Sequence, residues 1–320
     1  MTKQQLGHIP VMEAQVVEAL LPALTASPEP VFVDATVGMG GHASALLTAC
    51  PKANLIGIDQ DGEAIAAAGQ RLAVFGDRVH LVRARFDDLP DVLDGLGVSH
   101  VAAVLMDLGM SSLQIDEMSR GFSYSKDAPL DMRMDDRLDV NAAVIVNTWS
   151  AAELARVIHD FGEEPHALRV AQAIVAARDT TPIKTTGRLS DVVTQAMPAA
   201  IRFGSGGHPA KRVFQALRIA VNGELEALAN VLPSALASLQ LGGRVAVLAY
   251  HSLEDRLVKQ AFQRASANLA PRRLPIVPEP MMPRFALVTN GALRPTAEEI
   301  KANPRAASAR LRVITRVKEA

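Results

Sequence analysis

The chain has 320 residues, of which 49% are hydrophobic and 21% are charged, and its formal net charge is −1. This composition is typical of a globular protein with a substantial core and excludes a largely disordered chain. The only cysteine, Cys50, excludes an intrachain disulfide. No signal-peptide core and no apolar run of the ~18 residues needed to span a bilayer is found. We therefore expect a soluble, cytoplasmic protein with no membrane contact.

A strand followed by a glycine-rich turn lies early in the chain, in the sequence VFVDATVGMGGH at 31–42. Gly38, Gly40 and Gly41 allow positive φ angles and a close approach of the backbone to a ligand. The helix expected from about His42 would direct its first amide groups at that ligand. The pattern predicts a site for a cofactor that contains a nucleoside.

Asp34, at the end of this strand, separates two classes of cofactor. The spacing Gly38-x-Gly40-x-x-Ala43 fits a dinucleotide fingerprint, but a carboxylate beside a pyrophosphate would repel it. S-adenosylmethionine instead presents cationic ammonium and sulfonium groups, for which an aspartate is a suitable neighbour. Asp34 could also serve only as a turn residue. The sequence favours S-adenosylmethionine, with an NAD-dependent oxidoreductase as the enzymatic alternative.

A second strand is expected over 54–61, with Asp59 near its end. Asp59 lies 25 residues beyond Asp34, near the spacing at which a carboxylate receives ribose hydroxyls. The alternative is that Asp59 caps the helix expected over 62–72. We favour the ribose role because the strand would place Asp59 at the carboxyl edge of the sheet.

Two further strands, over 79–86 and 101–107, complete the first half of an α/β sheet. Phe86, at the end of the third strand, could stack on an adenine or pack in the core. Asp107 ends the fourth strand. Because the carboxyl ends of parallel strands meet at one edge, Asp107 should lie beside the earlier aspartates.

The next strand is expected only at 243–249, and a gap of this length indicates an inserted domain. Helical spacing within the gap predicts a small helical insert. We expect a discontinuous catalytic domain, residues 1–118 and 214–320, around an inserted substrate-binding domain, residues 119–213. A terminal antiparallel pair is expected at 285–288 and 311–317.

Several blocks together resemble the MraW family of bacterial small-subunit rRNA methyltransferases, also called methyltransferase H. They are DATVGMGGH at 34–42, MDLGMSSLQID at 106–116, RGFSY and PLDMRMD within 120–135, HPAKRVFQALRIAVNGEL at 208–225 and HSLEDR at 251–256. The resemblance implies a class I S-adenosylmethionine-dependent methyltransferase fold, Rossmann-like, with a mixed sheet and an inserted helical domain. It also implies methylation of N4 of a cytidine in the decoding region of 16S rRNA.

The resemblance assigns the donor site to matching positions. Gly40, Gly41 and His42 should line it, with Asp59 at the ribose, Phe86 near the adenine, and Asp107 and Gln114 completing the pocket; Asp34 and Gly38 are added from the residue argument above. Acceptors that bind the amino protons would make N4 more nucleophilic. Candidates for the catalytic site are Asp107, Leu108, Ser111, Ser112 and His251, although Asp107 could serve only the donor and His251 could cap a strand.

The substrate is expected to be 16S rRNA, within the small ribosomal subunit, with its target base extruded from the stack. From Arg264 onward there are 11 Lys plus Arg and 4 Asp plus Glu, a balance of +7, which suits phosphate contact or a solvated surface. Methylation of carbon C5 would need a nucleophilic thiol, and Cys50 is expected to pack instead. Candidate RNA contacts are Arg120, Asp131, Arg133, His208, Lys211 and Arg212.

No spacing of His, Cys or carboxylates resembles a metal site. The oligomeric state is left open, with a homo-oligomer among the alternatives. A non-catalytic RNA-binding assembly factor with a degenerate methyltransferase fold is the second functional alternative.

Overall fold

The computed structural model describes residues 10–111, 114, 117–203, 207–268 and 281–319. The chain divides into two compact units. The sheet unit is discontinuous and consists of Met1–Gly109 and Glu226–Ala320, and the helical unit is the contiguous segment Met110–Leu225.

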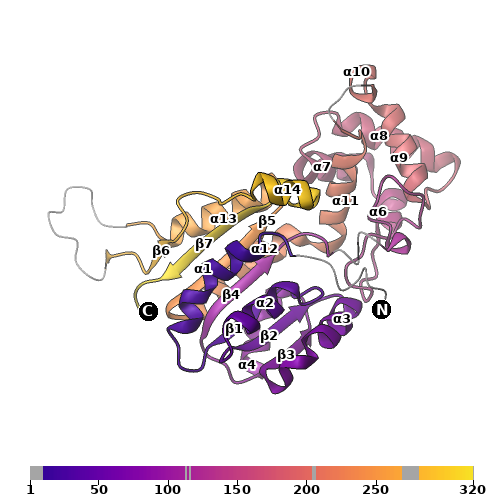
Figure 1. Cartoon of the computed structure of the whole chain (residues 1–320). Coiled ribbons are helices and arrows are strands. Elements are labelled where there is room, and N and C mark those ends of the chain that lie inside the picture. The colour runs from indigo at the N-terminus through magenta and orange to yellow at the C-terminus, as the bar shows by residue number, and fades with distance from the viewer. Residues whose placement is uncertain (1–9, 112–113, 115–116, 204–206, 269–280, 320) are drawn as a thin grey trace. The chain divides into compact units, whose positions relative to one another are not determined.

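The sheet unit is built on one seven-stranded sheet with the order β3-β2-β1-β4-β5-β7-β6 (Figure 1). The first five strands are parallel, and β7 and β6 are antiparallel to their neighbours. This confirms the expected mixed α/β sheet and its terminal pair. The strands are β1 (Val31–Asp34), β2 (Asn54–Asp59), β3 (Val79–Arg83), β4 (Val101–Asp107), β5 (Leu239–Ala249), β6 (Phe285–Leu287) and β7 (Arg310–Arg316).

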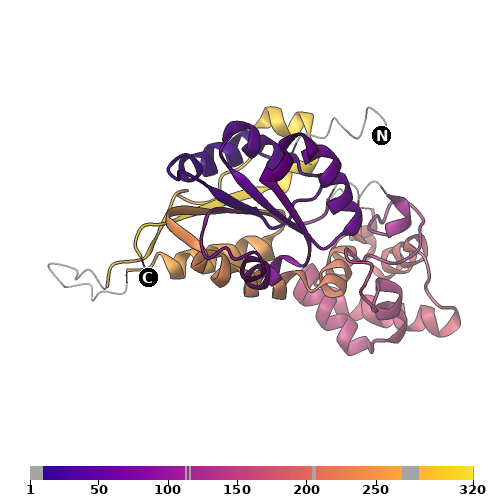
Figure 2. The same ribbon diagram turned by 90° about the horizontal axis from the view of Figure 1, so that it is seen from below.

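Helices cover both faces of this sheet because the central strands are apolar on both sides. In β1, Phe32 packs into the core under the first helices, whereas Val33 packs into the core on the opposite face. Figure 2 shows the indigo and violet helices α1, α2 and α3 on one face and the orange helices α12 and α13 on the other. The helices are α1 (Glu13–Thr25), α2 (Gly41–Ala49), α3 (Gly62–Leu72), α4 (Leu89–Gly95), α12 (Glu224–Ala237), α13 (Ser252–Ala265) and α14 (Ala297–Ala302), with 3₁₀ turns η1 (Ala73–Arg78), η2 (Phe86–Asp88) and η5 (Pro304–Ser308).

The helical unit has its own hydrophobic core, to which every one of its longer helices contributes. A capping box begins α7 (Ala151–Gly162), where the Ser150 hydroxyl accepts from the Glu153 amide at 3.3 Å. Its helices are η3 (Met118–Arg120), α6 (Ala142–Thr148), α7 (Ala151–Gly162), α8 (Ala167–Thr180), α9 (Thr186–Ala196), α10 (Ala199–Arg202) and α11 (Lys211–Asn222).

The apolar residues from Phe214 to Leu228 follow helical spacing, and in the structure they are divided between two helices. Gly223 has φ 61° and ends α11 in the left-handed conformation, and α12 begins at the next residue. Phe214 packs in the core of the helical unit, whereas Leu228 packs in the core of the sheet unit. Helix α11 packs within the helical unit, and this compact unit spans Met110–Leu225, whereas the sequence predicts an inserted domain over residues 119–213.

Among the helices of the described residues, none combines the length and the apolar character needed to cross a bilayer.

Candidate active site

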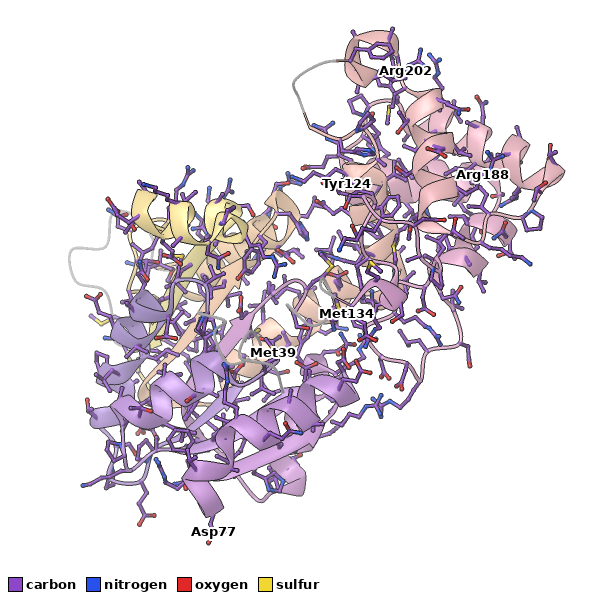
Figure 3. All side chains as sticks on the ribbon, turned by 45° about the vertical axis from the view of Figure 1, so that its right-hand side comes forward. Met39, Asp77, Tyr124, Met134, Arg188 and Arg202 are labelled. Atoms are coloured by element: carbon purple, nitrogen blue, oxygen red, sulfur yellow. The ribbon has the colours of Figure 1, made fainter. Side chains whose placement is uncertain are left out.

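The glycine turn joins β1 to α2 as the sequence predicts. Gly38 and Gly40 have φ angles of 50° and 75°, in the left-handed region that glycine adopts without strain. Gly40 is the N-cap of α2, so the first amides of that helix follow the turn directly. Met39 lies on this turn in Figure 3. The turn therefore offers backbone amides to a ligand at the carboxyl edge of the sheet.

The Asp59 side chain connects this turn to the end of β2 through hydrogen bonds. Its Oδ2 accepts a hydrogen bond from the Gly38 amide at 2.8 Å, and its Oδ1 accepts one from the Asp61 amide at 2.9 Å. The N-cap of α3 is Asp61, whose side chain accepts from the Glu63 amide, so the expected alternative that Asp59 caps this helix is wrong. Burial raises the pKa of Asp59 to about 6, against the effect of the amide donors.

Asp34 is almost completely enclosed, with 1% of its surface exposed. Its Oδ1 accepts from the Thr36 amide at 3.3 Å, so the expected turn contact is present. Burial raises the pKa of Asp34 to about 8; the Thr36 amide acts in the opposite direction, and the nearby carboxylates of Asp107 and Asp59 raise it further. A carboxyl group with a pKa near neutral pH is a suitable partner for a cation, because a bound cation would favour the charged carboxylate.

Asp107 has partners from three separate segments. The Tyr250 hydroxyl donates to Asp107 Oδ1 at 2.7 Å, and the Asp107 amide donates to Thr36 Oγ1 at 2.6 Å. His42 Nδ1 lies 3.5 Å from Asp107 Oδ2. The other ring nitrogen of His42 lies 2.9 Å from the Val11 carbonyl, which only accepts, so that nitrogen carries a proton. The carboxylate is therefore fixed in orientation by the strand end and two side chains.

Tyr250 and Thr36 are site residues that the sequence analysis missed. Tyr250 directly follows β5, and burial, followed by the charge of Asp107, raises its pKa well above the ordinary value. Its hydroxyl is therefore protonated and acts as a donor at neutral pH. The one sequence signal for Tyr250 is its position after a buried strand whose carboxyl end reaches the same edge as Asp107.

His251, expected as a catalytic residue or a strand cap, is the N-cap of helix α13. Its Nδ1 accepts from the Glu254 amide at 3.4 Å, and Glu254 Oε2 accepts from the amides of Tyr250 and His251 at 2.8 and 3.2 Å. The capping box stabilises the connection that holds Tyr250 in place.

A protein-family model called MraW methylase family matches residues 5–317. The chain belongs to the MraW methylase family. It is 55% identical over 311 residues to "Ribosomal RNA small subunit methyltransferase H" of Cutibacterium acnes, covering 97% of this chain and 92% of that one. A relative of the same name from Streptomyces avermitilis is 52% identical over 315 residues, covering 98% of each chain.

A solved structure described as an rRNA methylase from Streptococcus thermophilus is 12% identical, covers 96% of this chain and 94% of its own, and has a TM-score of 0.40. Family membership confirms the expected class I methyltransferase fold and the S-adenosylmethionine-dependent class of cofactor. It contradicts the alternative of an NAD-dependent oxidoreductase.

The remaining candidates of this MraW family member are Phe86 and Gln114 for the donor site, and Ser111, Ser112 and Leu108 for the catalytic site. Phe86 begins η2 and is partly buried against the core beneath the sheet, which leaves its adenine contact a prediction. In the helical unit, Gln114 is buried, its Oε1 accepts from the Ser111 amide at 3.1 Å, and its own amide donates to Ser111 Oγ at 3.3 Å. Ser112 lies outside the described residues. Leu108 is buried, and its amide donates to the Leu248 carbonyl at 3.0 Å.

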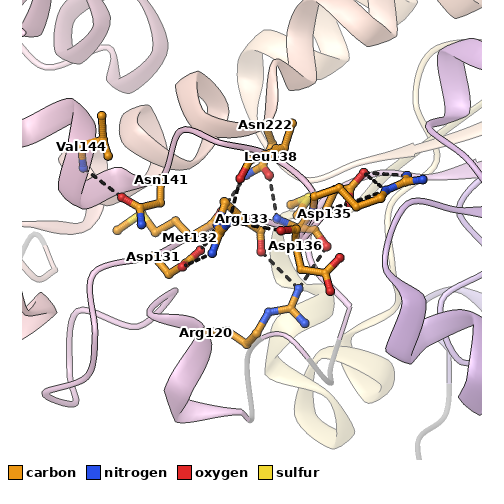
Figure 4. Close-up of polar contacts among 12 residues, drawn as sticks. Arg120, Asp131, Met132, Arg133, Asp135, Asp136, Leu138, Asn141, Val144 and Asn222 are labelled. Carbon is orange, nitrogen blue, oxygen red and sulfur yellow. Dashed lines mark hydrogen bonds and ion pairs between the residues drawn. The ribbon is translucent and has the colours of Figure 1, made fainter.

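Three RNA candidates hold one another within the loop that opens the helical unit (Figure 4). Arg133 forms a fork with Asp131, with both contacts at 2.8 Å, and donates to the Leu138 carbonyl at 2.6 Å. Arg120 donates to the carbonyls of Arg133 and Met134. Burial opposes ionisation of Asp131, but the bonds from Arg133 outweigh it and lower the pKa of Asp131. In the structure, these three side chains stabilise the conformation of the loop.

The other RNA candidates lie at the start of α11. His208 stacks on Tyr124 with ring centroids 4.7 Å apart, and Lys211 is exposed. Arg212 is about half exposed and donates to the Glu163 carbonyl at 3.1 Å. Arg218, on the same helix, is 12% exposed and forms a fork with Glu224.

Proposed function

We propose that this protein transfers a methyl group from S-adenosylmethionine to the exocyclic N4 of a cytidine in the decoding region of 16S rRNA. The observation that carries the proposal is the oriented carboxylate of Asp107, held by Tyr250 at the end of β4 beside the glycine turn. Support for the RNA substrate is the match of the whole chain to relatives named as small-subunit rRNA methyltransferases.

The residues around the turn fit the donor chemically. The Asp59 carboxylate accepts the Gly38 and Asp61 amides, and a carboxylate has about four acceptor positions, so it can also accept a ribose hydroxyl. Asp34 would face the cationic end of the donor, and Phe86 its adenine. Gly38, Gly40 and Gly41 would supply close backbone, with His42 and Gln114 completing the site. The bound donor supplies an electrophilic methyl group.

The amine needs activation because its lone pair is delocalised into the cytosine ring. Acceptors that bind both amino protons favour a pyramidal nitrogen, and we assign this role to the Asp107 carboxylate and the Leu108 carbonyl. In the transfer, the N4–methyl bond forms as the sulfur–methyl bond breaks, and the extra proton on N4 passes to Asp107 or to water. Fixed orientation of Asp107 by Tyr250 would lower the cost of reaching this geometry.

The substrate RNA would be held by the helical unit and by the basic C-terminal region, within the small ribosomal subunit. The loop residues Arg120, Asp131 and Arg133 would act mainly by shaping this surface, because they are engaged with one another. Lys211, which is exposed, and Arg212 at the start of α11 are better suited to phosphate contact.

The test is transfer of labelled methyl from S-adenosylmethionine to small ribosomal subunits lacking the modification, in parallel with protein-free 16S rRNA. Nucleoside mass spectrometry should give N4-methylcytidine, and the better acceptor identifies the natural form of the substrate. The matched control is Asp107→Asn, which keeps the size of the side chain but removes its charge. Donor binding without transfer to either acceptor would refute the proposal and favour the non-catalytic assembly factor.

A further inference from the structure

A pocket in the sheet unit adjoins the proposed amine site. It is formed where the start of α13 meets the segment after β6 and the connection from η5 to β7. The residues that line it are Tyr250, His251, Ser252, Arg294, Ala307, Ser308, Ala309 and Arg310. The mechanism above uses Tyr250 of this set and leaves the rest of the pocket unassigned.

Two arginines, Arg294 and Arg310, are among the residues that line this pocket. Arg310 Nη1 contacts Asp255 Oδ2 at 2.9 Å, and Arg312 forms a fork with the same carboxylate at 2.7 and 3.1 Å. Two guanidinium groups thus share the Asp255 carboxylate, and the opposing charge nearby is the buried carboxylate of Glu254, which lies 3.1 Å from His251 Nε2. Arg294 adds a second cation from an exposed position. An anion is the ligand that this charge distribution favours.

The polar groups of the pocket suit a phosphate group in particular. Ser252 and Ser308 provide hydroxyl donors, and Ser252 is also the first residue of the fourteen-residue helix α13. The His251 side chain is nine-tenths buried, and its Nε2 makes no hydrogen bond within the described residues, although it lies 3.1 Å from Glu254 Oε1. Guanidinium forks and hydroxyls together match the several acceptor oxygens of a phosphate.

The position of the pocket indicates the source of that phosphate. Tyr250 lines the pocket, and its hydroxyl donates to the Asp107 carboxylate at 2.7 Å. We propose that the pocket binds a backbone phosphate of the substrate RNA close to the target nucleotide, with Arg294 and Arg310 as its main ligands. This inference rests on the proposed function for the identity of the substrate.

The test compares rRNA binding by the double variant Arg294→Gln, Arg310→Gln with that of the wild type. Binding to protein-free 16S rRNA is measured by filter retention over a range of salt concentrations. Loss of one phosphate contact should lower the slope of log affinity against log salt by about 0.7 and reduce affinity roughly tenfold. The charge-retaining variant Arg310→Lys should keep most of the slope.

The matched control is the double variant Lys52→Gln, Lys259→Gln, which also removes two positive charges, from exposed side chains outside the pocket and outside the basic region that begins at Arg264. The control should retain the wild-type slope. If the arginine double variant binds rRNA as the wild type does, or if the control and the arginine double variant lose the same slope, the pocket proposal is wrong. Thermal unfolding of each variant checks the fold, and the single variant Arg294→Gln changes only an exposed side chain.

Two further arms separate the alternatives. If inorganic phosphate raises the melting temperature of the wild type but not of the double variant, while both bind rRNA equally, the pocket serves free phosphate and the RNA assignment is overturned. Methyl transfer is measured separately. If the wild type transfers methyl groups and the variants bind rRNA as the wild type does, only the pocket proposal is refuted. If the wild type is inactive but the double variant binds rRNA more weakly than the wild type, only the proposed reaction is refuted.

Discussion

Replacing Asp34 by asparagine tests the donor site through proton linkage. Burial raises the pKa of this carboxyl to about 8, so the free protein holds the proton at pH 6.5. A cationic donor beside Asp34 would favour the carboxylate, and binding would release that proton below pH 8. The deprotonation costs about 2 kcal/mol at pH 6.5, because the pKa lies about 1.5 pH units higher. Donor affinity should therefore rise about 30-fold between pH 6.5 and a plateau above pH 8.

The assay is titration calorimetry at pH 6.5, 7.5 and 8.5 in buffers of two ionisation enthalpies. Wild-type protein should release up to one proton at pH 6.5, and Asp34→Asn should bind more weakly at high pH but lose most of the pH dependence. S-adenosylhomocysteine, which lacks the sulfonium charge, should show a smaller rise. Equal proton release by wild type and Asp34→Asn would refute the assigned contact.

The raised pKa of Asp34 also determines how the stability of the free protein changes with pH. Between pH 4 and pH 8 the unfolded chain has lost the Asp34 proton while the folded chain retains it, so the contribution of this group makes stability fall as the pH rises. Denaturant unfolding of the wild type should show this fall, and Asp34→Asn should reduce it.

Four other substitutions test three separate parts of the structure. Asp59→Ala removes the acceptor of the Gly38 amide and the proposed ribose ligand, and calorimetry should show donor affinity reduced at least ~30-fold; unchanged affinity contradicts the ribose role. Asp107→Ala should reduce turnover at saturating donor by at least ~100-fold, and Tyr250→Phe by about tenfold, in the methyl-transfer assay; full activity of Asp107→Ala removes it from the mechanism. Gly121→Ala should cost at least about 2 kcal/mol in denaturant unfolding, because φ is +70° and a Cβ would collide with the Pro129 carbonyl oxygen; a stable variant would show that this turn relaxes.

The convergence of Asp34, Asp59 and Asp107 could be predicted because it follows from strand direction alone. Parallel strands that alternate with helices bring their carboxyl ends to one edge, whatever the details of packing. Tyr250 could not be found in this way. Its hydroxyl meets a residue 143 positions away, and no local pattern distinguishes that contact from ordinary core packing.

Sequence analysis was least informative where one residue type serves two purposes. His251 follows a strand at the active edge, yet its ring caps the next helix. Asp131 and Arg133 suggest substrate contact, but residues two apart in a loop can also pair with each other, as they do here. The periodic pattern through Gly223 likewise concealed a change of unit, because helical spacing does not reveal which core each turn enters.

The interruption of the sheet unit by residues 110–225 has a consequence during synthesis. Strand β4 leaves the ribosome long before β5, its neighbour in the sheet. At ordinary elongation rates the intervening segment takes on the order of ten seconds to make. Throughout that interval one edge of an apolar strand is without its partner, while the contiguous helical unit is already being completed. The nascent chain therefore passes through a stage at which half a sheet must be kept from pairing with other chains.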